Sequence, residues 1–305
     1  PRTREIIEAF VAAGAPEEIR YLQKPHIGTD LLVGVMEGIR EEIIRLGGRV
    51  LFSTRMDQLI IRQGQLQGVT MQDGQGQREI ITHHAVLALG HSARDTIHTL
   101  FQQGFPMVQK PFAMGLRIEH HQAMIDRSQY GLAAGHPRLG AAEYKLVHHT
   151  RDSRGVYSFC MCPGGFVVPS ATSPDEVVVN GMSPSNRGSR WANAGWVVEI
   201  RPEDLPDCLC QGMPEGDASL PPVLSVMDFQ ERLERLCRLN GGMTQTAPAQ
   251  RMADFVRKKN SSHLPVSSYT PGLLASPLHF WMPEFITTRL REGFRHSDRV
   301  SHGFL

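Results

Sequence analysis

The stretch Ala85-Val86-Leu87-Ala88-Leu89-Gly90-His91-Ser92-Ala93-Arg94-Asp95 decides the expected fold of this chain. Its first five residues are all apolar, which is typical of a strand buried on both faces of a parallel sheet. Gly90 allows a tight turn, and Ser92 is a good N-cap for a following helix. Ligands bind at the carboxyl ends of such strands in doubly wound folds. The stretch is consistent with part of an α/β ligand-binding domain, although these eleven residues taken alone favour an ordinary buried strand before a capped helix.

The residues before this stretch predict the rest of a first domain. Apolar spacing and terminal glycines indicate two amphipathic helices, and short alternating runs indicate strands joined by tight turns. A helix followed by a strand is half of a βαβ dinucleotide-binding unit. The expected helices cover 4–13 and 31–46, and the expected strands cover 49–54, 59–61, 65–71, 79–82 and 85–89.

From Lys110 onward the sequence pattern predicts a mainly β domain. Short apolar runs alternate with turns rich in Gly, Pro and Ser, and few helical patterns intervene until the last third. The fold class is therefore α/β in the broad sense, or α+β. The expected strands cover 112–118, 144–149, 156–162, 166–168, 177–179 and 196–200, and the later helices cover 229–239, 249–258 and 282–294.

Composition argues against nucleic-acid-binding, membrane-spanning and disulfide-rich proteins. The chain has 305 residues, with 32 basic and 31 acidic side chains, so no overall field favours nucleic acid or a membrane surface as a partner. No apolar run approaches the roughly 20 residues of a membrane-spanning helix. Five cysteines in so long a chain do not form a disulfide scaffold, and a reducing, cytoplasmic location fits them best.

The segment Phe159-Cys160-Met161-Cys162-Pro163-Gly164-Gly165 places two thiols at the end of a predicted strand. Cys160 and Cys162 are candidates for redox chemistry, although Cys-x-Cys closes a smaller ring than the usual Cys-x-x-Cys. Together with Cys208 and Cys210 they would make four thiols for zinc, at a spacing unlike that of common zinc fingers. The plainest interpretation is two small residues packed at alternate positions of a strand.

The segment Arg117-Ile118-Glu119-His120-His121 brings a cation, a carboxylate and two imidazoles together at another strand end. Such groups can bind a substrate carboxylate or move a proton. Alternation puts Arg117 and Glu119 on one face and Ile118 and His120 on the other, so a regular strand keeps them apart. A lone histidine in this position is more often structural than catalytic.

The loop Lys24-Pro25-His26-Ile27-Gly28-Thr29-Asp30 leads into the N-terminus of a predicted helix. Free backbone N–H groups and the positive end of the helix dipole suit an anion or an electron-rich ring edge there. A turn followed by a capped helix accounts for the same residues, with Thr29 or Asp30 as the cap.

Taken together and in order, five motifs resemble one family: the bacterial uncharacterised FAD-dependent dehydrogenases, also described as NAD(P)/FAD-dependent oxidoreductases. The resemblance extends over essentially the whole chain. It rests on 24–30 (KPHIGTD), 89–95 (LGHSARD), 110–120 (KPFAMGLRIEH), 157–165 (YSFCMCPGG) and 180–183 (NGMS).

This resemblance implies a flavoprotein in which a Rossmann-like FAD-binding domain is interrupted by a β-rich domain. It implies domains at 1–109 (partial FAD-binding), 110–245 (β-rich substrate or cap domain) and 246–305 (a helical return). FAD contacts would come from Gly28, Thr29, Asp30, Met56, Gly90, His91 and Ser92. Candidates to line the catalytic pocket are Arg117, His120, Cys160 and Cys162.

The implied activity is hydride transfer through FAD to or from a small-molecule substrate, with NAD(P)H as a possible electron donor. Family members also have a Gly-x-Gly-x-x-Gly segment and a C-terminal glycine-rich flavin segment, neither of which is present in these residues. We therefore expect a central fragment of such an enzyme. The alternatives are an inactive fragment or binding domain without flavin, and a thiol-redox or zinc site at Cys160 and Cys162; the balanced charge argues against a flavoprotein acting on RNA.

Overall fold

The computed structural model describes residues 2–210, 212–217, 219–301 and 303–305. Contacts divide the chain into two compact units, one formed by residues 2–35 with 109–305 and the other by residues 36–108. Helix α2 (Thr29–Arg45) runs from the first unit into the second. The predicted domain limits at 109/110 and 245/246 stay a prediction.

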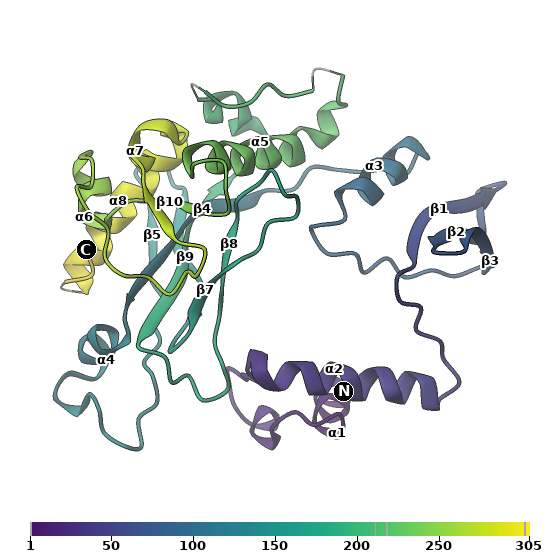
Figure 1. Ribbon diagram of the computed structural model, residues 1–305, viewed down its shortest axis with the longest axis horizontal. Helices are drawn as coiled ribbons and strands as arrows, with labels where there is room; N and C mark the ends of the chain where they lie inside the picture. Colours follow the sequence, from purple (N-terminus) through teal and green to yellow (C-terminus); the bar gives the residue numbers. More distant parts are fainter. Residues whose placement is uncertain (1, 211, 218, 302) are drawn as a thin grey trace. The chain divides into compact units, whose positions relative to one another are not determined.

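The smaller unit is built on an antiparallel meander, visible in Figure 1 beside the helix α3. Its strands are β1 (Arg55–Arg62), β2 (Gln65–Asp73) and β3 (Gly76–Ile81), and α3 covers Arg94–Gln102. The amide of Gln103 joins the helix to the meander, because its Nε2 donates to the Leu59 carbonyl at 2.7 Å and its Oε1 accepts the Leu59 N–H. The predicted three-stranded meander is confirmed.

Two strand predictions in this unit are wrong. Residues 85–89 are not a strand: they run without regular structure, and Val86 is 93% exposed. An apolar run forms a buried strand only between partner strands, and no described strand pairs with it. Residues 49–54 turn instead of extending, with Ser53 at a left-handed φ of 51°. Ser92 is not the N-cap of α3, because Ala93 holds that position.

The larger unit is centred on an antiparallel sheet of order β4-β9-β6-β5. Residues alternate along it, and in β9 the side chains of Ala192, Ala194, Trp196, Val198 and Ile200 are all fully buried. One face of the sheet therefore lies in the core, and the other face of β9 is covered as well, because Trp191, Asn193 and Gly195 are also buried. The strands are β4 (Phe112–His121), β5 (Val147–His149), β6 (Gly155–Cys162) and β9 (Trp191–Ile200).

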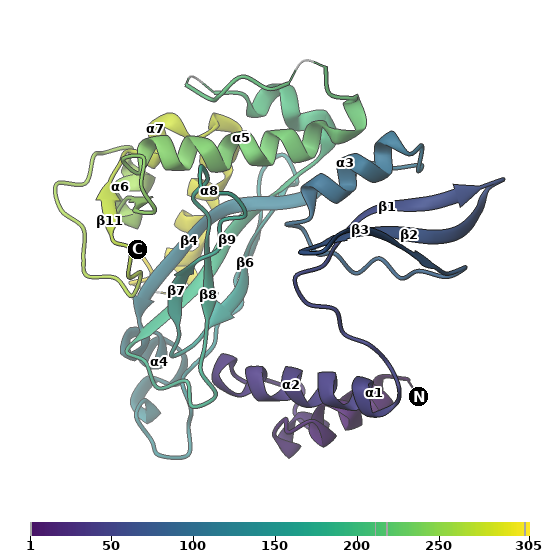
Figure 2. The same ribbon diagram turned by 45° about the vertical axis from the view of Figure 1, so that its right-hand side comes forward.

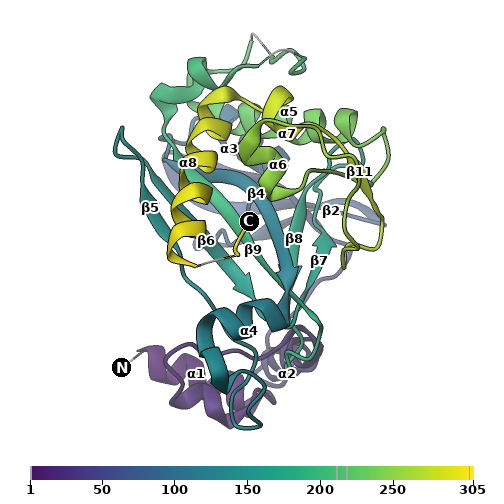
Figure 3. The ribbon, with the colours of Figure 1, turned by 90° about the vertical axis from the view of Figure 1, so that its left-hand side faces the viewer.

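Helix α8 (Glu284–Val300) covers the core face of this sheet (Figure 3). The Trp196 indole stacks on Phe294 of α8 at 5.1 Å between ring centroids, and its Nε1 donates to the Leu290 carbonyl at 3.2 Å. Gly293 of α8 lies so close to the sheet that a Cβ there would be 2.6 Å from Val156 Cγ1. The core is thus a helix laid on a sheet around Trp196.

Smaller elements surround this core. Helix α5 (Ser225–Asn240) lies near the ends of the strands, and the hairpin of β7 (Phe166–Pro169) and β8 (Val179–Met182) lies beside β9 (Figure 2). The remaining elements are α1 (Arg2–Ala12), η1 (Glu17–Arg20), α4 (Gln122–Tyr130), η2 (Gly131–Ala133), η3 (Pro202–Cys208), η4 (Pro222–Leu224), β10 (Ala247–Ala249), α6 (Met252–Arg257), β11 (Leu273–Ala275) and α7 (Leu278–Trp281).

The mixed α+β class is confirmed. A Rossmann-like sheet is not seen: β10 and β11 form the one parallel pair among the described residues. The helices predicted at 229–239 and 282–294 are confirmed as α5 and α8, whereas β8 begins at Val179 and the strand expected at 177–179 is displaced toward the C-terminus.

Candidate functional site

The outer face of the sheet carries a row of three aligned residues. Arg117 of β4 lies opposite Gly195 of β9, and Gly195 lies opposite Phe159 of β6. Because directly opposed residues share a face, a glycine with no side chain separates the guanidinium from an aromatic ring that is 57% exposed. Only the backbone of Gly195 therefore lies between the Arg117 guanidinium and the Phe159 ring in this row.

Arg117 is held in place by neutral groups. Its Nε donates to Asn193 Oδ1 at 2.9 Å, and its Nη2 donates to the Cys162 sulfur at 3.4 Å. Burial lowers the pKa of Arg117, and the acidic groups that oppose this are the thiols of Cys162 and Cys160 and the Tyr144 phenol. None of these is a carboxylate.

Two of those neighbours, the Tyr144 phenol and the Cys162 thiol, are uncharged at neutral pH. Burial raises the pKa of the Tyr144 phenol, and burial also raises the pKa of the Cys162 thiol although Arg117 acts against it. The guanidinium is therefore partly desolvated without a compensating negative charge. An unpaired charge in such a place is costly unless an anion or electron-rich group comes to it.

The two cysteines lie at an irregularity of β6. The register with β9 shifts between Phe159 and Cys162, and Cys160 in this bulge has a left-handed φ of 43°. Cys160 is exposed, whereas Cys162 is half-buried and its Sγ donates to the Cys160 carbonyl at 3.4 Å. A raised thiol pKa is the opposite of what a reactive thiolate needs. The described residues contain no cluster of three or more His, Cys, Asp or Glu that could hold a metal ion.

His120 is placed away from Arg117, on the core face of β4. Its Nε2–H donates to the Phe304 carbonyl at 2.8 Å, and its ring contacts those of Tyr144 and Phe304. Burial lowers the pKa of His120, which keeps it neutral. Strand alternation predicted this separation, and the structure brings Arg117 together with Cys162 but not with His120.

The loop at Gly28, Thr29 and Asp30 is joined to the chain just after β8. The Thr29 N–H donates to the Ser183 carbonyl at 3.2 Å, and the Asp30 carboxylate accepts the N–H and the hydroxyl of Ser185, both at 2.7 Å. These bonds lower the pKa of Asp30. The first turn of α2 is therefore supplied with a carboxylate of its own, which reduces its attraction for a phosphate.

The other four predicted FAD contacts belong to the smaller unit. Met56 lies in β1 opposite Met71, Gly90 turns the chain with a φ of 70°, and His91 and Ser92 are exposed before α3. Their role as FAD contacts stays a prediction.

The sequence did not reveal that Asn193 bonds to Arg117, or why position 181 requires a glycine. A Cβ built on Gly181 would overlap Arg117 Nη2 and Asn193 Oδ1, so the backbone of β8 lies directly on this pair. The segment 180–183 carried a usable signal, because it reads as a turn where backbone comes close to another group. Asn193 gave no such signal, since 76 residues separate it from Arg117.

A cavity of about 680 Å³ lies along β4, and its lining includes Phe159 and, from β4, Arg117, Glu119 and His120. Most of its wall is apolar, and its size is within the usual range for small-molecule sites. The apolar residues include Val167 of β7, Val179 of β8, Leu233 of α5, Phe255 of α6 and Val177, which lies between β7 and β8.

The model of the family described as "FAD-dependent protein, C-terminal domain-like" matches residues 111–305, which include the sheet, the Arg117 row and the cavity. The chain belongs to this family. Membership of an FAD-dependent family, predicted from the five motifs, is thereby confirmed.

A relative of this chain comes from Clostridium beijerinckii and is described as an uncharacterized protein. It is 39% identical over 302 residues, which cover 98% of this chain and 54% of the relative. The chain thus spans about half the length of that relative. Within the described residues, no helix is both long enough and apolar enough to cross a bilayer.

Replacing Gly181 with alanine is expected to move Arg117 at a moderate cost in stability. The new methyl group would meet both the far end of Arg117, which can swing away, and the fully buried Oδ1 of Asn193, which must shift, so the free energy of unfolding should fall by about 1–3 kcal/mol. Cys162 would lose the cation that lowers its pKa. The pH midpoint of Cys162 alkylation, followed by mass spectrometry, should therefore rise, as it should in Arg117→Met.

Gly155→Ala is the matched control, because a Cβ at Gly155 meets only ordinary contacts at 3.8 Å or more. An unchanged midpoint in Gly181→Ala would show that Gly181 does not hold Arg117 in position.

Proposed function

We propose that this protein is an FAD-dependent oxidoreductase that acts on a small-molecule substrate, with NAD(P)H as the candidate electron donor. The observation that carries the proposal is Arg117, a partly desolvated guanidinium with no carboxylate partner in the described part of the chain, which faces a cavity of small-molecule size. Membership of an FAD-dependent family supports the choice of cofactor.

The residues around Arg117 fit an electron-rich or anionic group. Asn193 is fully buried, and its Nδ2 has no hydrogen-bond partner, so a neutral donor lies beside the cation. The FAD itself would be held by Gly28, Thr29, Asp30, Met56, Gly90, His91 and Ser92. Thr29 and Asp30 already bond to the segment 183–185, so this loop would contribute mainly the backbone around Gly28.

When bound, the flavin supplies hydride transfer, and the protein supplies position and electrostatics. Arg117 would stabilise negative charge in the group beside it, because a fixed cation in a desolvated site costs no reorganisation. The Cys162 thiol, protonated at neutral pH, would hold a proton at Sγ next to that charge. His120, buried on the opposite face, would take no direct part.

The test is a visible absorbance spectrum of the purified protein after incubation with excess FAD and desalting. We expect a flavin band near one equivalent, and retention about tenfold weaker in His91→Ala, since a hydrogen bond to a charged group contributes about 1.5–3 kcal/mol. His84→Ala, which changes another exposed histidine of the same unit, is the control. A colourless protein under every condition would contradict the proposal and favour a binding domain without flavin.

A further inference from the structure

Two hydrogen-bond donors at the Arg117 row are unused by the protein. Among the described residues Arg117 takes part in no ion pair, and its two bonds, to Asn193 and Cys162, use Nε and Nη2. Its Nη1 lies toward Gly195, where a built Cβ would be 3.7 Å away. That side of the guanidinium faces the bare backbone of the glycine.

The second donor is the amide nitrogen of Asn193. Arg117 Nε is a donor, so the amide atom that meets it must be Oδ1, and this fixes Nδ2 on the other side of the group. Asn193 is 0% exposed, and Nδ2 has no partner among the described residues. Asn193 is not one of the residues that line the cavity, so its part is to hold Arg117 in position.

The backbone of β8 covers one side of the Arg117–Asn193 pair. Gly181 lies against Nη2 and Asn193 Oδ1, which leaves the Nη1 side for a ligand. From there the cavity of about 680 Å³ continues along an apolar wall that includes Phe159, Val179 and Leu233. The site thus joins a cationic end to a long apolar space.

We propose that this cavity binds an organic acid, with its carboxylate at Arg117 and its apolar body along the wall of the cavity. The proposal rests on the proposed function, since it names the substrate class of the same site. A carboxylate suits Arg117 Nη1 because a hydrogen bond between a guanidinium and a carboxylate is charge-assisted and stronger than a neutral one. An apolar body suits the cavity because its burial is favourable.

Isothermal titration calorimetry of the flavin-free protein with octanoate, octanol and octylamine tests whether the cavity requires a negatively charged group on its ligand. Octanoate should bind at one site, about 10- to 100-fold more tightly than octanol, since a hydrogen bond to a charged group is worth about 1.5–3 kcal/mol. Octylamine, which has the same chain and the opposite charge, should bind more weakly still. Across butyrate, hexanoate and octanoate, affinity should rise about fourfold per CH₂ group.

Arg117→Met should lower octanoate affinity to the level of octanol and leave octanol affinity unchanged. Arg127→Met, which alters an exposed arginine of α4, is the matched control and should change neither. Circular dichroism of both variants should match that of the parent protein.

Three results would overturn the proposal: no binding of octanoate, equal binding of octanoate and octanol, or full displacement of octanoate by an equal concentration of inorganic phosphate. Flavin retention is measured separately. If octanoate binds through Arg117 but FAD is not retained, the organic-acid site stands and the oxidoreductase function fails; if FAD is retained and octanoate does not bind, the reverse holds.

Discussion

Replacing Gly293 with valine is expected to lower the free energy of unfolding by about 1–3 kcal/mol, the usual cost of overpacking a core. A Cβ at this position in α8 would lie 2.6 Å from Val156 Cγ1 and 2.9 Å from Trp196 Cζ2. Val156 and Trp196 are both 0% exposed, so neither can move into solvent. Urea denaturation followed by circular dichroism measures the change.

A glycine in an open helix gives the matched control. Gly34 in α2 is exposed and has nothing within 4 Å of a built Cβ, so Gly34→Ala should stabilise the protein by up to about 1 kcal/mol through helix propensity. Val156→Ala should partly compensate for Gly293→Ala in a double-mutant cycle, because it removes the methyl group in the way. Purely additive effects would show that Gly293 and Val156 are not in contact.

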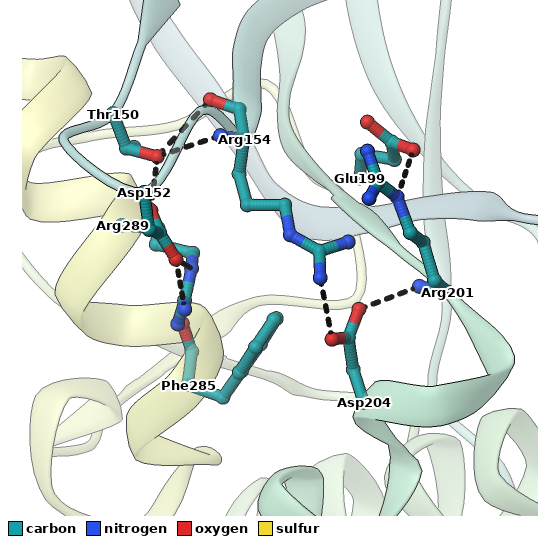
Figure 4. A network of polar contacts seen from close by, with 8 residues as sticks. All are labelled: Thr150, Asp152, Arg154, Glu199, Arg201, Asp204, Phe285 and Arg289. Atoms are coloured by element: carbon teal, nitrogen blue, oxygen red, sulfur yellow. Dashed lines mark hydrogen bonds and ion pairs between the residues drawn. The ribbon is translucent and has the colours of Figure 1, made fainter.

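Asp204→Asn is expected to lower the free energy of unfolding by about 3–5 kcal/mol, the cost of leaving one member of a buried ion pair alone. Arg154 Nη2 donates to Asp204 Oδ1 at 2.7 Å, and the Arg201 N–H donates to Oδ2 at 2.8 Å (Figure 4). The side chains of Arg154 and Asp204 are 12% and 8% exposed. Arg154 Nη1 is already buried without a partner among the described residues, and Glu199, whose carboxylate also interacts with Arg154, is already paired with Arg201.

The same network contains a surface pair for comparison. Arg201 and Glu199 form an ion pair at 2.8 Å with side chains 41% and 33% exposed, so Glu199→Gln should cost less than about 1 kcal/mol. Thermal and urea denaturation of the two variants should separate them clearly. Similar losses in Asp204→Asn and Glu199→Gln would contradict the assignment of Asp204 as the buried partner.

Local patterns predicted elements whose neighbours are close in sequence. The meander around Leu59 and the amphipathic helix α8 were predicted because a turn or a 3.6-residue period lies within one short window. The run at 85–89 was mispredicted for a related reason: its apolarity indicates burial, but burial depends on partner strands that the run does not contain. Val86 is exposed instead.

The candidate site was predictable only in part. Alternation along one strand correctly separated Arg117 from His120. It could not place Asn193 or Gly181 against Arg117, because strand register between distant segments decides those contacts. Nor could residue types show that Arg117 lacks a carboxylate partner, since any of the 31 acidic residues was available in principle.

The hydrogen bonds between the start of α2 and the segment 183–185 connect this helix to the backbone beside Arg117. Thr29 and Asp30 fasten that segment, and Ser183 follows Gly181, the residue packed on Arg117, by only two positions. Removing the Asp30 carboxylate would therefore free the backbone that follows β8, next to the residue that packs on Arg117.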